Sequence, residues 1–175
     1  MWPKEPIPDE DHVYRHCHYT DVIKEKRLRF PNEAHFKPYS DGLSVNWDKK
    51  ISLKQVFILL GLTHKPNQNV DFKDYKQFQV FKFPIKLLRG IPGIESVEHD
   101  PVFLGNPSPK GKPNNPAHTL VKYPDDEEIR MTLSDYSREN STETYCPFDV
   151  NSLNAEIEEL RLRLPDVPYN KDWIM

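Results

Sequence analysis

Alternating histidines in the segment HVYRHCHY, residues 12–19, are the first feature whose residue types and spacing could do chemistry. The segment is predicted to be a β-strand, in which neighbouring side chains point to opposite faces. One face therefore carries His12, Tyr14, His16 and His18. Imidazoles at positions i and i+2 can reach one ion, so His16 and His18 are a candidate pair of divalent-metal ligands. The alternative is a polar sheet face with exposed histidines.

A zinc site at this strand would need a third and a fourth ligand from other parts of the chain. The candidates are His99, Asp100, His118 and Cys146. Cys17 lies between the two histidines in the sequence but is expected on the opposite face of the strand. A packed, inert thiol is therefore favoured there over an activated one. Two cysteines this far apart form neither a disulfide framework nor a Cys-x-x-Cys site.

The longest irregular segment is HDPVFLGNPSPKGKPNNPAH, residues 99–118, which contains five prolines and two glycines. Proline fixes φ and lacks a hydrogen-bond donor, so the segment is predicted to be a stiff loop between two strands. Its glycines do not have the spacing of a phosphate-binding loop, and Pro113 stands where a serine or threonine would bind magnesium.

Polar residues at the two ends of this loop are candidate site residues, because rigid scaffolds often hold functional groups on loops. His99 and Asp100 at the first end, with Asn115 and His118 at the second, could form a general-base or ligand-binding group. The alternative is that the Asp-Pro and Asn-Pro dipeptides only set turns. We predict that the ends of the loop, and not its glycine–lysine middle, face the ligand.

The elements that must position these residues are short and mixed. Strands are predicted at 12–19, 28–30, 43–47, 77–85, 94–103 and 117–123. Helical segments are predicted at 21–27, 53–60, 85–93 and 125–137, and from Ser152 onward. Because strands and helices do not alternate regularly, the fold class is α+β: a single domain with a mixed or mostly antiparallel sheet and about four helices.

Two helices carry recognisable start signals. Ser52 and Gln55 form a capping box before residues 53–60, and Gly61 is expected to take the left-handed position just after that helix. Asp125 with Glu128 gives a second capping pattern for residues 125–137.

The C-terminal helix has apolar residues at i, i+4, i+7 and i+11, namely Leu153, Ile157, Leu160 and Leu164. This stripe is most simply a face that docks on the core, and the alternative is docking on a partner subunit. The expected organisation is an extended N-terminal arm (1–11), an α+β core (12–150) and a C-terminal helix with an extended tail (151–175).

Charge and composition limit the classes of function. The 175 residues include 24 basic and 27 acidic side chains, a net charge of −3. Duplex-DNA binders normally present a basic face, so the charge does not favour nucleic acid as a partner. The basic run Lys24, Lys26, Arg27 and Arg29 could contact a phosphate backbone or form a solvated helix face.

No stretch approaches 18 apolar residues, and the N-terminus lacks the apolar segment of a signal peptide. We therefore expect a cytoplasmic protein without a membrane partner.

Several segments together resemble a group of small uncharacterised bacterial proteins that share an early aromatic-Arg-His, a mid-chain LSV, a DP and an NPAH-like segment. The matching segments here are YRH (14–16), Phe36, LSVNW (43–47), HDP (99–101) and NPAH (115–118). The resemblance spans roughly residues 12–136. It implies a bacterial or phage setting, and it directs attention to Arg15, Ser44, Asp100, Asn115 and His118.

A second set of residues is similar to the start of ADP-ribosyltransferase-like toxins: Arg15 or His16 on the first strand, the segment DVIKEKRLRF, and Ser44 on a later strand. This resemblance implies that Arg15 or His16 holds the nicotinamide-ribose side of NAD and that Ser44 orders the site. The catalytic glutamate of such enzymes has no clear match, and Glu95, Glu98 and Glu128 are available.

These observations lead to three hypotheses. The first is a binding or regulatory subunit of a larger intracellular bacterial or phage assembly, in a defence or toxin–antitoxin setting. The second is an NAD-using, ADP-ribosyltransferase-like enzyme with Arg15, His16 and Ser44 in its site. The third is a metal-dependent hydrolase or nuclease that uses His16, His18 and either His99 or His118.

Overall fold

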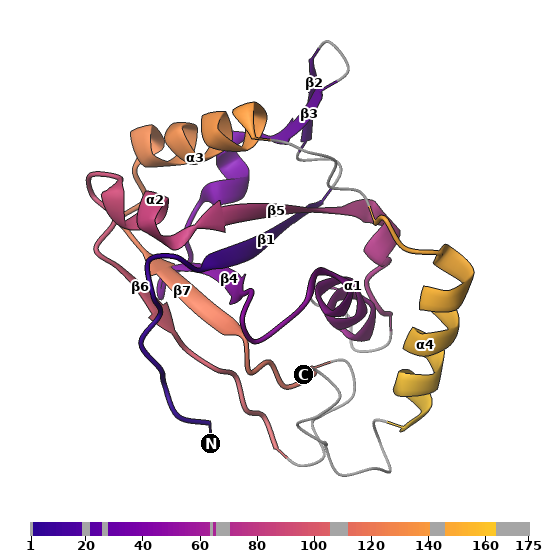
Figure 1. Cartoon of the computed structure of the whole chain (residues 1–175). Helices are drawn as coiled ribbons and strands as arrows, with labels where there is room; N and C mark the ends of the chain where they lie inside the picture. The colour runs from indigo at the N-terminus through magenta and orange to yellow at the C-terminus, as the bar shows by residue number, and fades with distance from the viewer. Residues whose placement is uncertain are drawn as a thin grey trace.

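The computed structural model describes residues 2–18, 22–25, 28–63, 65, 71–105, 112–140 and 146–163. It is an α+β domain built on a five-stranded antiparallel sheet with four α-helices among these residues. This confirms the expected fold class (Figure 1).

The main sheet has the strand order β5-β1-β4-β7-β6, and every neighbouring pair is antiparallel. Its strands are β1 (His12–His18), β4 (Leu43–Trp47), β5 (Phe78–Pro84), β6 (Ser96–His99) and β7 (His118–Lys122). Each lies inside a segment that the sequence predicted to be extended. The predicted strand 94–103 is cut to four residues because the proline-rich segment begins at Pro101.

A separate two-stranded hairpin is formed by β2 (Val22–Glu25) and β3 (Leu28–Pro31). The prediction of a helix at 21–27 was therefore wrong. Val22 and Ile23 are β-branched residues that lose side-chain freedom in a helix, and the extended segment 28–31 offers them a partner strand. The basic run lies on this hairpin and not on a helix face, with Lys24 opposite Arg29. Lys26 and Arg27 lie outside the described residues.

The four helices are α1 (Leu53–Leu62), α2 (Ile85–Gly90), α3 (Glu127–Glu139) and α4 (Val150–Arg163), with 3-10 turns at η2 (Glu33–Phe36) and η3 (Tyr75–Gln77). The capping box of α1 is confirmed: Gln55 N donates to Ser52 Oγ, and Ser52 N donates to Gln55 Oε1.

Gly61 does not take the predicted left-handed position, because α1 continues through Leu62 and ends at Thr63. A Cβ atom at Gly61 would lie 2.7 Å from Cδ1 of Ile157. Glycine at this position lets α4 approach α1 closely, so its role is helix packing rather than helix termination. The cap of α3 also differs from the prediction by one residue, since Asp126 accepts from Glu128 N and Ile129 N.

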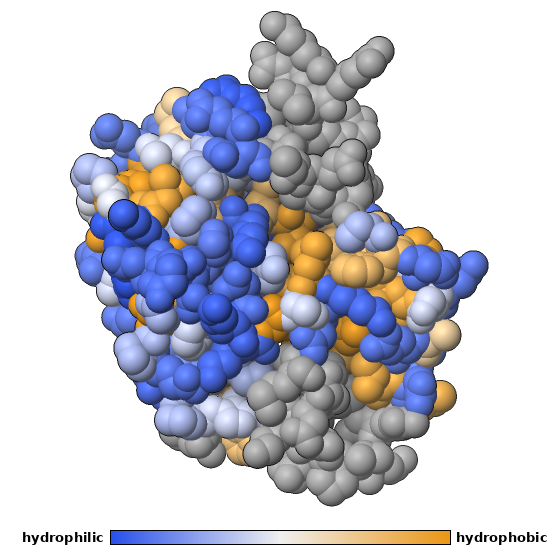
Figure 2. All heavy atoms as spheres, in the orientation of Figure 1, coloured by the Kyte–Doolittle hydropathy of each residue, from blue (hydrophilic) through white to orange (hydrophobic). Residues whose placement is uncertain are grey.

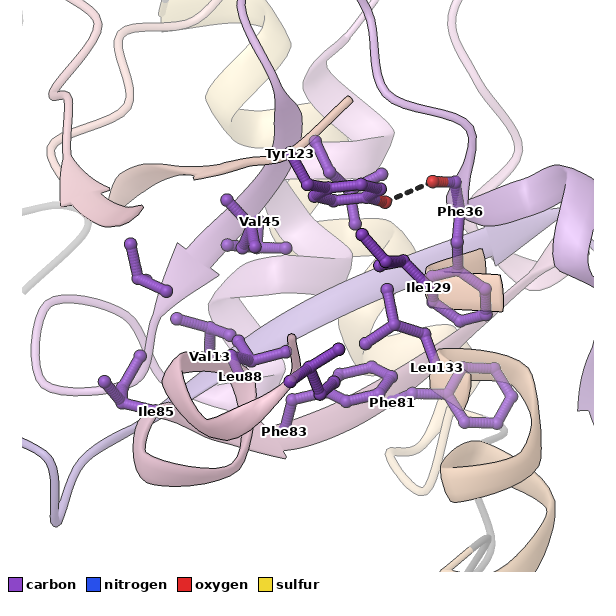
Figure 3. Close-up of a cluster of buried hydrophobic side chains, with 14 of the residues drawn as sticks. Val13, Phe36, Val45, Phe81, Phe83, Ile85, Leu88, Tyr123, Ile129 and Leu133 are labelled. Carbon is purple, nitrogen blue, oxygen red and sulfur yellow. Dashed lines mark hydrogen bonds between the residues drawn. The ribbon is translucent and has the colours of Figure 1, made fainter. Parts of the chain in front are cut away.

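One face of the sheet packs under α2, α3 and η2. Figure 3 shows this cluster, in which Val13, Val45, Phe81 and Phe83 from the strands meet side chains of the covering elements, including Phe36, Leu88, Ile129 and Leu133. The hydroxyl of Tyr123 donates to the carbonyl of Phe36 and joins the cluster to η2. The N-terminal arm reaches the same core through the buried Ile7.

The opposite face of the sheet packs against α1 and α4. Within this second core, Leu153 and Ile157 of the C-terminal stripe are fully buried and Leu160 packs at the edge. The core-docking interpretation of the stripe is therefore confirmed for these three residues, and burial removes Leu153 and Ile157 from any partner surface. Leu164 lies outside the described residues.

Hydrophilic and hydrophobic residues are unevenly distributed on the surface. On the face shown in Figure 2, hydrophilic residues dominate the left side, and hydrophobic residues gather near the middle and around α1 and α4. Within the described residues, no helix is long and apolar enough to cross a membrane.

Candidate functional site

Three predicted site residues meet where β4, β7 and β6 lie side by side. Ser44 is on β4, His118 begins β7, and Asp100 follows the last residue of β6. The strand register places Asn46 opposite His118, and Ser44 is two residues from Asn46, so Ser44 and His118 share one face of the sheet. The backbone N–H of Asp100 donates to the carbonyl of His118 at 2.9 Å, which closes the ends of the loop on each other.

The imidazole of His118 has a partner on each nitrogen. Its Nε2 lies 2.6 Å from Ser44 Oγ, and its Nδ1 lies 2.7 Å from the backbone oxygen of Asp100. A carbonyl can only accept, so Nδ1 carries the proton, and Nε2 is left to accept from the serine hydroxyl. A serine hydroxyl bonded to an oriented imidazole is the arrangement that activates an oxygen nucleophile.

The carboxylate of Asp100 has a secondary place in this group. Its Oδ2 is 3.9 Å from His118 Nδ1, and its Oδ1 forms a 2.6 Å ion pair with Lys4 of the N-terminal arm. The His118 and Asp100 side chains are 16% and 33% exposed, and Ser44 is partly exposed as well. Solvent and a ligand can therefore reach the pair.

Two amide side chains adjoin the serine–histidine pair. Asn115 Nδ2 donates to Asn46 Oδ1 at 2.7 Å, and Asn46 is the buried ladder partner of His118. The backbone of Asn115 is held by a bridge to Val102, and its Oδ1 accepts from Ala117 N at 3.1 Å. The Asn-Pro segment therefore makes a turn, as one interpretation expected, and it also places the Asn115 amide against Asn46, the strand partner of His118.

His99 lies apart from this group although it begins the same loop. Its side chain is buried on the opposite face of the sheet, where its ring packs edge-on against Trp47. Its Nδ1 accepts from Glu5 N at 3.1 Å, and its Nε2 donates to the carbonyl of Pro116 at 2.6 Å. Both ring nitrogens are used by backbone groups, so His99 fixes the loop and the N-terminal arm instead of facing a ligand.

β1 and β4 separate beside Ser44. Their paired residues are Val13 with Trp47 and Tyr14 with Asn46, and the pairing does not continue to Ser44. Side chains fill this split: Arg15 donates to the carbonyls of Ser44 (2.7 Å) and His35 (3.1 Å), and His35 Nε2 donates to the carbonyl of His16 (2.9 Å).

His16 lies on the other face of the sheet from Arg15, and both His16 and Lys73 lie near the ring of Phe78. The ring of Phe78 packs edge-on against His16, and Lys73 Nζ lies 5.8 Å from the centre of that ring. Burial, with further contributions from Arg15, Lys73 and His35, lowers the pKa of His16 well below its ordinary value. Burial and Arg15 also lower the pKa of Lys73. His16 is therefore a neutral imidazole at neutral pH.

Among the residues that the structure describes, the predicted metal ligands are not brought together. His18 shares its face with His16, but its Nε2 bonds to Gln77 Oε1 at 3.2 Å and its ring packs on Phe78. Across the described ranges, no three His, Cys, Asp or Glu side chains are grouped so that they could hold a metal ion. Cys17 is buried on the opposite face, as predicted, and Cys146 packs beside the second core.

The glutamates expected from the ADP-ribosyltransferase resemblance are separated from Ser44. Glu98 is the nearest of them in the sheet, but Leu120 lies between it and Ser44 in the strand register. Its carboxylate bonds to Ser96 and Lys122. Glu95 precedes β6, and Glu128 is in the first turn of α3.

The sequence interpretation did not include His35, Asn46 or Lys73. His35 lies one residue before Phe36, and Asn46 is inside LSVNW, so both adjoin residues of the predicted motifs. Lys73 had no sequence signal, because only the packing of segment 71–77 on the sheet brings it near Phe78.

No protein-family model matches this chain, and no curated protein or solved structure is significantly similar to it. The role of the site therefore follows from its chemistry alone.

Proposed function

We propose that this protein is an enzyme that transfers or hydrolyses an acyl group through Ser44. The observation that carries the proposal is the 2.6 Å hydrogen bond between Ser44 Oγ and His118 Nε2, with His118 Nδ1 held by Asp100 O. Serine nucleophiles commonly have a base hydrogen-bonded to their hydroxyl, and a third group orients that base.

In the first step, Ser44 Oγ attacks the carbonyl carbon of an ester or thioester, and His118 Nε2 takes the hydroxyl proton. The tetrahedral adduct then breaks its bond to the leaving group, which receives that proton from His118. Water, deprotonated by the same imidazole, cleaves the acyl-serine and restores Ser44. The positive charge of the protonated His118 is stabilised by the Asp100 carboxylate, whose Oδ2 lies 3.9 Å from Nδ1.

The negative oxygen of the adduct needs a hydrogen-bond donor. Asn115 is the candidate, because its amide has two N–H groups and Asn46 accepts one of them. Asn46 is 3% exposed, so this contact fixes the orientation of the Asn115 amide.

The three hypotheses from the sequence relate to this proposal in different ways. The binding-subunit hypothesis and the NAD hypothesis remain predictions. Ser44 is part of the site both in the NAD hypothesis and in the present proposal. The metal-dependent hypothesis needs ligands around His16 and His18, and the described part of the chain groups no third ligand with them.

A fluorophosphonate probe tests the proposal directly, because it phosphonylates serine side chains that an adjacent base has activated. We expect one equivalent of label on the wild-type protein, located at Ser44 by peptide mass spectrometry, and none on Ser44→Ala. Ser96→Ala is the matched control: Ser96 is a partly exposed serine on the same sheet face, but its Oγ bonds to Glu98 instead of an imidazole. Absence of labelling in the wild type, or labelling that persists in Ser44→Ala, overturns the proposal.

A further inference from the structure

The backbone carbonyl of Ser44 points toward β1 at the place where the pairing of β1 with β4 has ended. Asp48 N donates to the carbonyl of His12 on β1, and the pairing continues only as far as Tyr14 with Asn46. Alternate residues of an antiparallel strand direct their backbone groups to the same neighbouring strand. Ser44 lies an even number of positions before Asp48, so its carbonyl also faces β1. It therefore needs a hydrogen-bond donor other than a strand partner.

Arg15 takes the place of the missing strand partner. Its Nη1 donates to the carbonyl of Ser44 at 2.7 Å, and its Nη2 donates to the carbonyl of His35 on η2 at 3.1 Å. The His35 side chain holds β1 in turn, since its Nε2 donates to the carbonyl of His16 at 2.9 Å. Three elements, β1, β4 and η2, are therefore joined around the residue that carries the proposed nucleophile.

An arginine is costly at this position. Arg15 is 8% exposed, and its Nε has no hydrogen-bond partner among the described residues. Buried charges are normally paired with an opposite charge, whereas the carbonyls that Arg15 contacts are neutral. The planar guanidinium can, however, donate to two carbonyls on different elements in fixed directions. This geometry accounts for an arginine at residue 15.

We propose that Arg15 is a positioning residue for Ser44, with His35 as its support. The inference rests on the proposed function, because it concerns the reactivity of the same serine. Ser44 Oγ lies 2.6 Å from His118 Nε2, and proton transfer to the imidazole needs this close contact. Arg15 fixes Ser44 from the β1 side, while β7 pairs with β4 on the other side. Without the guanidinium, the backbone at Ser44 can shift and lengthen the bond to His118.

Arg15 acts through the backbone of Ser44 and not on the substrate. It follows Tyr14 along β1, and Tyr14 shares a face of the sheet with Asn46 and Ser44. The Arg15 side chain therefore points to the opposite face from the serine hydroxyl. Its substitution should slow the chemical step and leave the affinity for a substrate or probe unchanged.

The experiment measures labelling of Ser44 by a fluorophosphonate probe at increasing probe concentration, which separates the maximum labelling rate from the half-maximum concentration. Arg15→Lys keeps the charge and loses the planar fork. We expect its maximum rate to fall at least about 10-fold. Its half-maximum concentration and pH profile should stay those of the wild type, because His118 remains the base.

Arg130→Lys is the matched control. Arg130 also has a buried Nε without a partner in the described part of the chain, but its Nη1 bonds to the Asp125 carboxylate and not to the backbone of Ser44. This variant should be labelled at the wild-type maximum rate. A second control is chemical rescue of Arg15→Ala. Guanidinium ion, at concentrations too low to unfold the protein, should restore part of the maximum rate, and sodium ion should not.

The outcomes separate this inference from the proposed function. A folded Arg15→Lys protein with the wild-type maximum rate overturns the positioning role and leaves Ser44 as the nucleophile. If Arg15→Lys does not fold, His35→Ala decides, because it removes the bond to His16 and should also lower the maximum rate. A folded His35→Ala protein with the wild-type rate then overturns the inference. A wild type that the probe does not label rejects the serine nucleophile itself, and the positioning role with it.

Discussion

His99 and His118 stand at the two ends of one loop, on neighbouring strands, yet the structure uses them in opposite ways. His99 is 3% exposed, and both its ring nitrogens bond to backbone groups. His118 is partly exposed and presents one nitrogen to the hydroxyl of Ser44. The two rings carry their protons on different nitrogens, Nε2 in His99 and Nδ1 in His118, because a carbonyl lies beside a different nitrogen in each case.

The comparison shows that the group bonded to the unprotonated ring nitrogen decides whether a histidine has a structural or a chemical role. In His99 that partner is the N–H of Glu5, which cannot react. In His118 that partner is the hydroxyl of Ser44, which can react with the carbonyl group of a substrate. The strand pleat makes the difference, since His99 lies opposite Thr119 in the register and so faces away from the neighbouring residue His118.

The largest expected effect is the loss of Ser44 reactivity in His118→Gln. Glutamine cannot act as a base at neutral pH, so the rate of fluorophosphonate labelling should fall at least about 10³-fold. The rate is measured by gel fluorescence over time, and the fold is checked by circular dichroism. If the folded His118→Gln protein were labelled at the wild-type rate, His118 would have only a structural role, like His99.

His99→Ala should instead act on stability. The change removes two hydrogen bonds, leaves the N–H of Glu5 and the carbonyl of Pro116 without their partner, and opens a cavity beside Trp47. We expect the free energy of unfolding to fall by about 2–4 kcal/mol. Urea titration followed by tryptophan fluorescence measures the change. Labelling of Ser44 should persist wherever the variant is folded, and loss of labelling in folded protein would contradict the separation of roles.

Asp100→Ala should have a smaller effect, because the backbone carbonyl that orients His118 remains after the side chain is removed. We expect the labelling rate to fall less than about 10-fold, compared with about 10⁴-fold for the loss of the aspartate in a serine–histidine–aspartate triad. A fall of that larger size would show that the carboxylate, and not the carbonyl, supports His118. The exposed ion pair of Lys4 with Asp100 provides a control through Lys4→Ala, which should leave the rate near that of the wild type.

The smallest expected effect is a pH dependence of stability that comes from His16. Because the pKa of His16 is lowered in the folded protein, the unfolded chain takes up the proton first as the pH falls below about 6.5. Folding stability should therefore be lost as the pH falls from 6.5 toward the lower, folded-state pKa. His16→Gln should lose about 1 kcal/mol less than the wild type between pH 7 and 5.5. Urea midpoints across this range measure the difference, and parallel curves for the two proteins would contradict it.

Much of the local structure was predictable because it depends on nearby residues. Alternation along β1 placed Arg15 and Cys17 on one face and the histidines on the other, and the capping box at Ser52 set the start of α1. The hairpin at β2 was missed because a short charged segment fits a helix equally well until its pairing with β3 is known. Gly61 was misread because the nearby α4 helix, and not the local sequence, determines its role.

The sequence by itself determined the residue types at the site and the faces on which strand residues lie. Only the tertiary structure decided that β4 lies next to β7, which brings Ser44 and His118 within 2.6 Å across 74 positions of sequence. It also decided that β1 and β4 separate beside Arg15, and that His99 faces the core. The physical reason is that side-chain periodicity is a local property, whereas strand order depends on non-local backbone pairing and on which apolar faces are buried together.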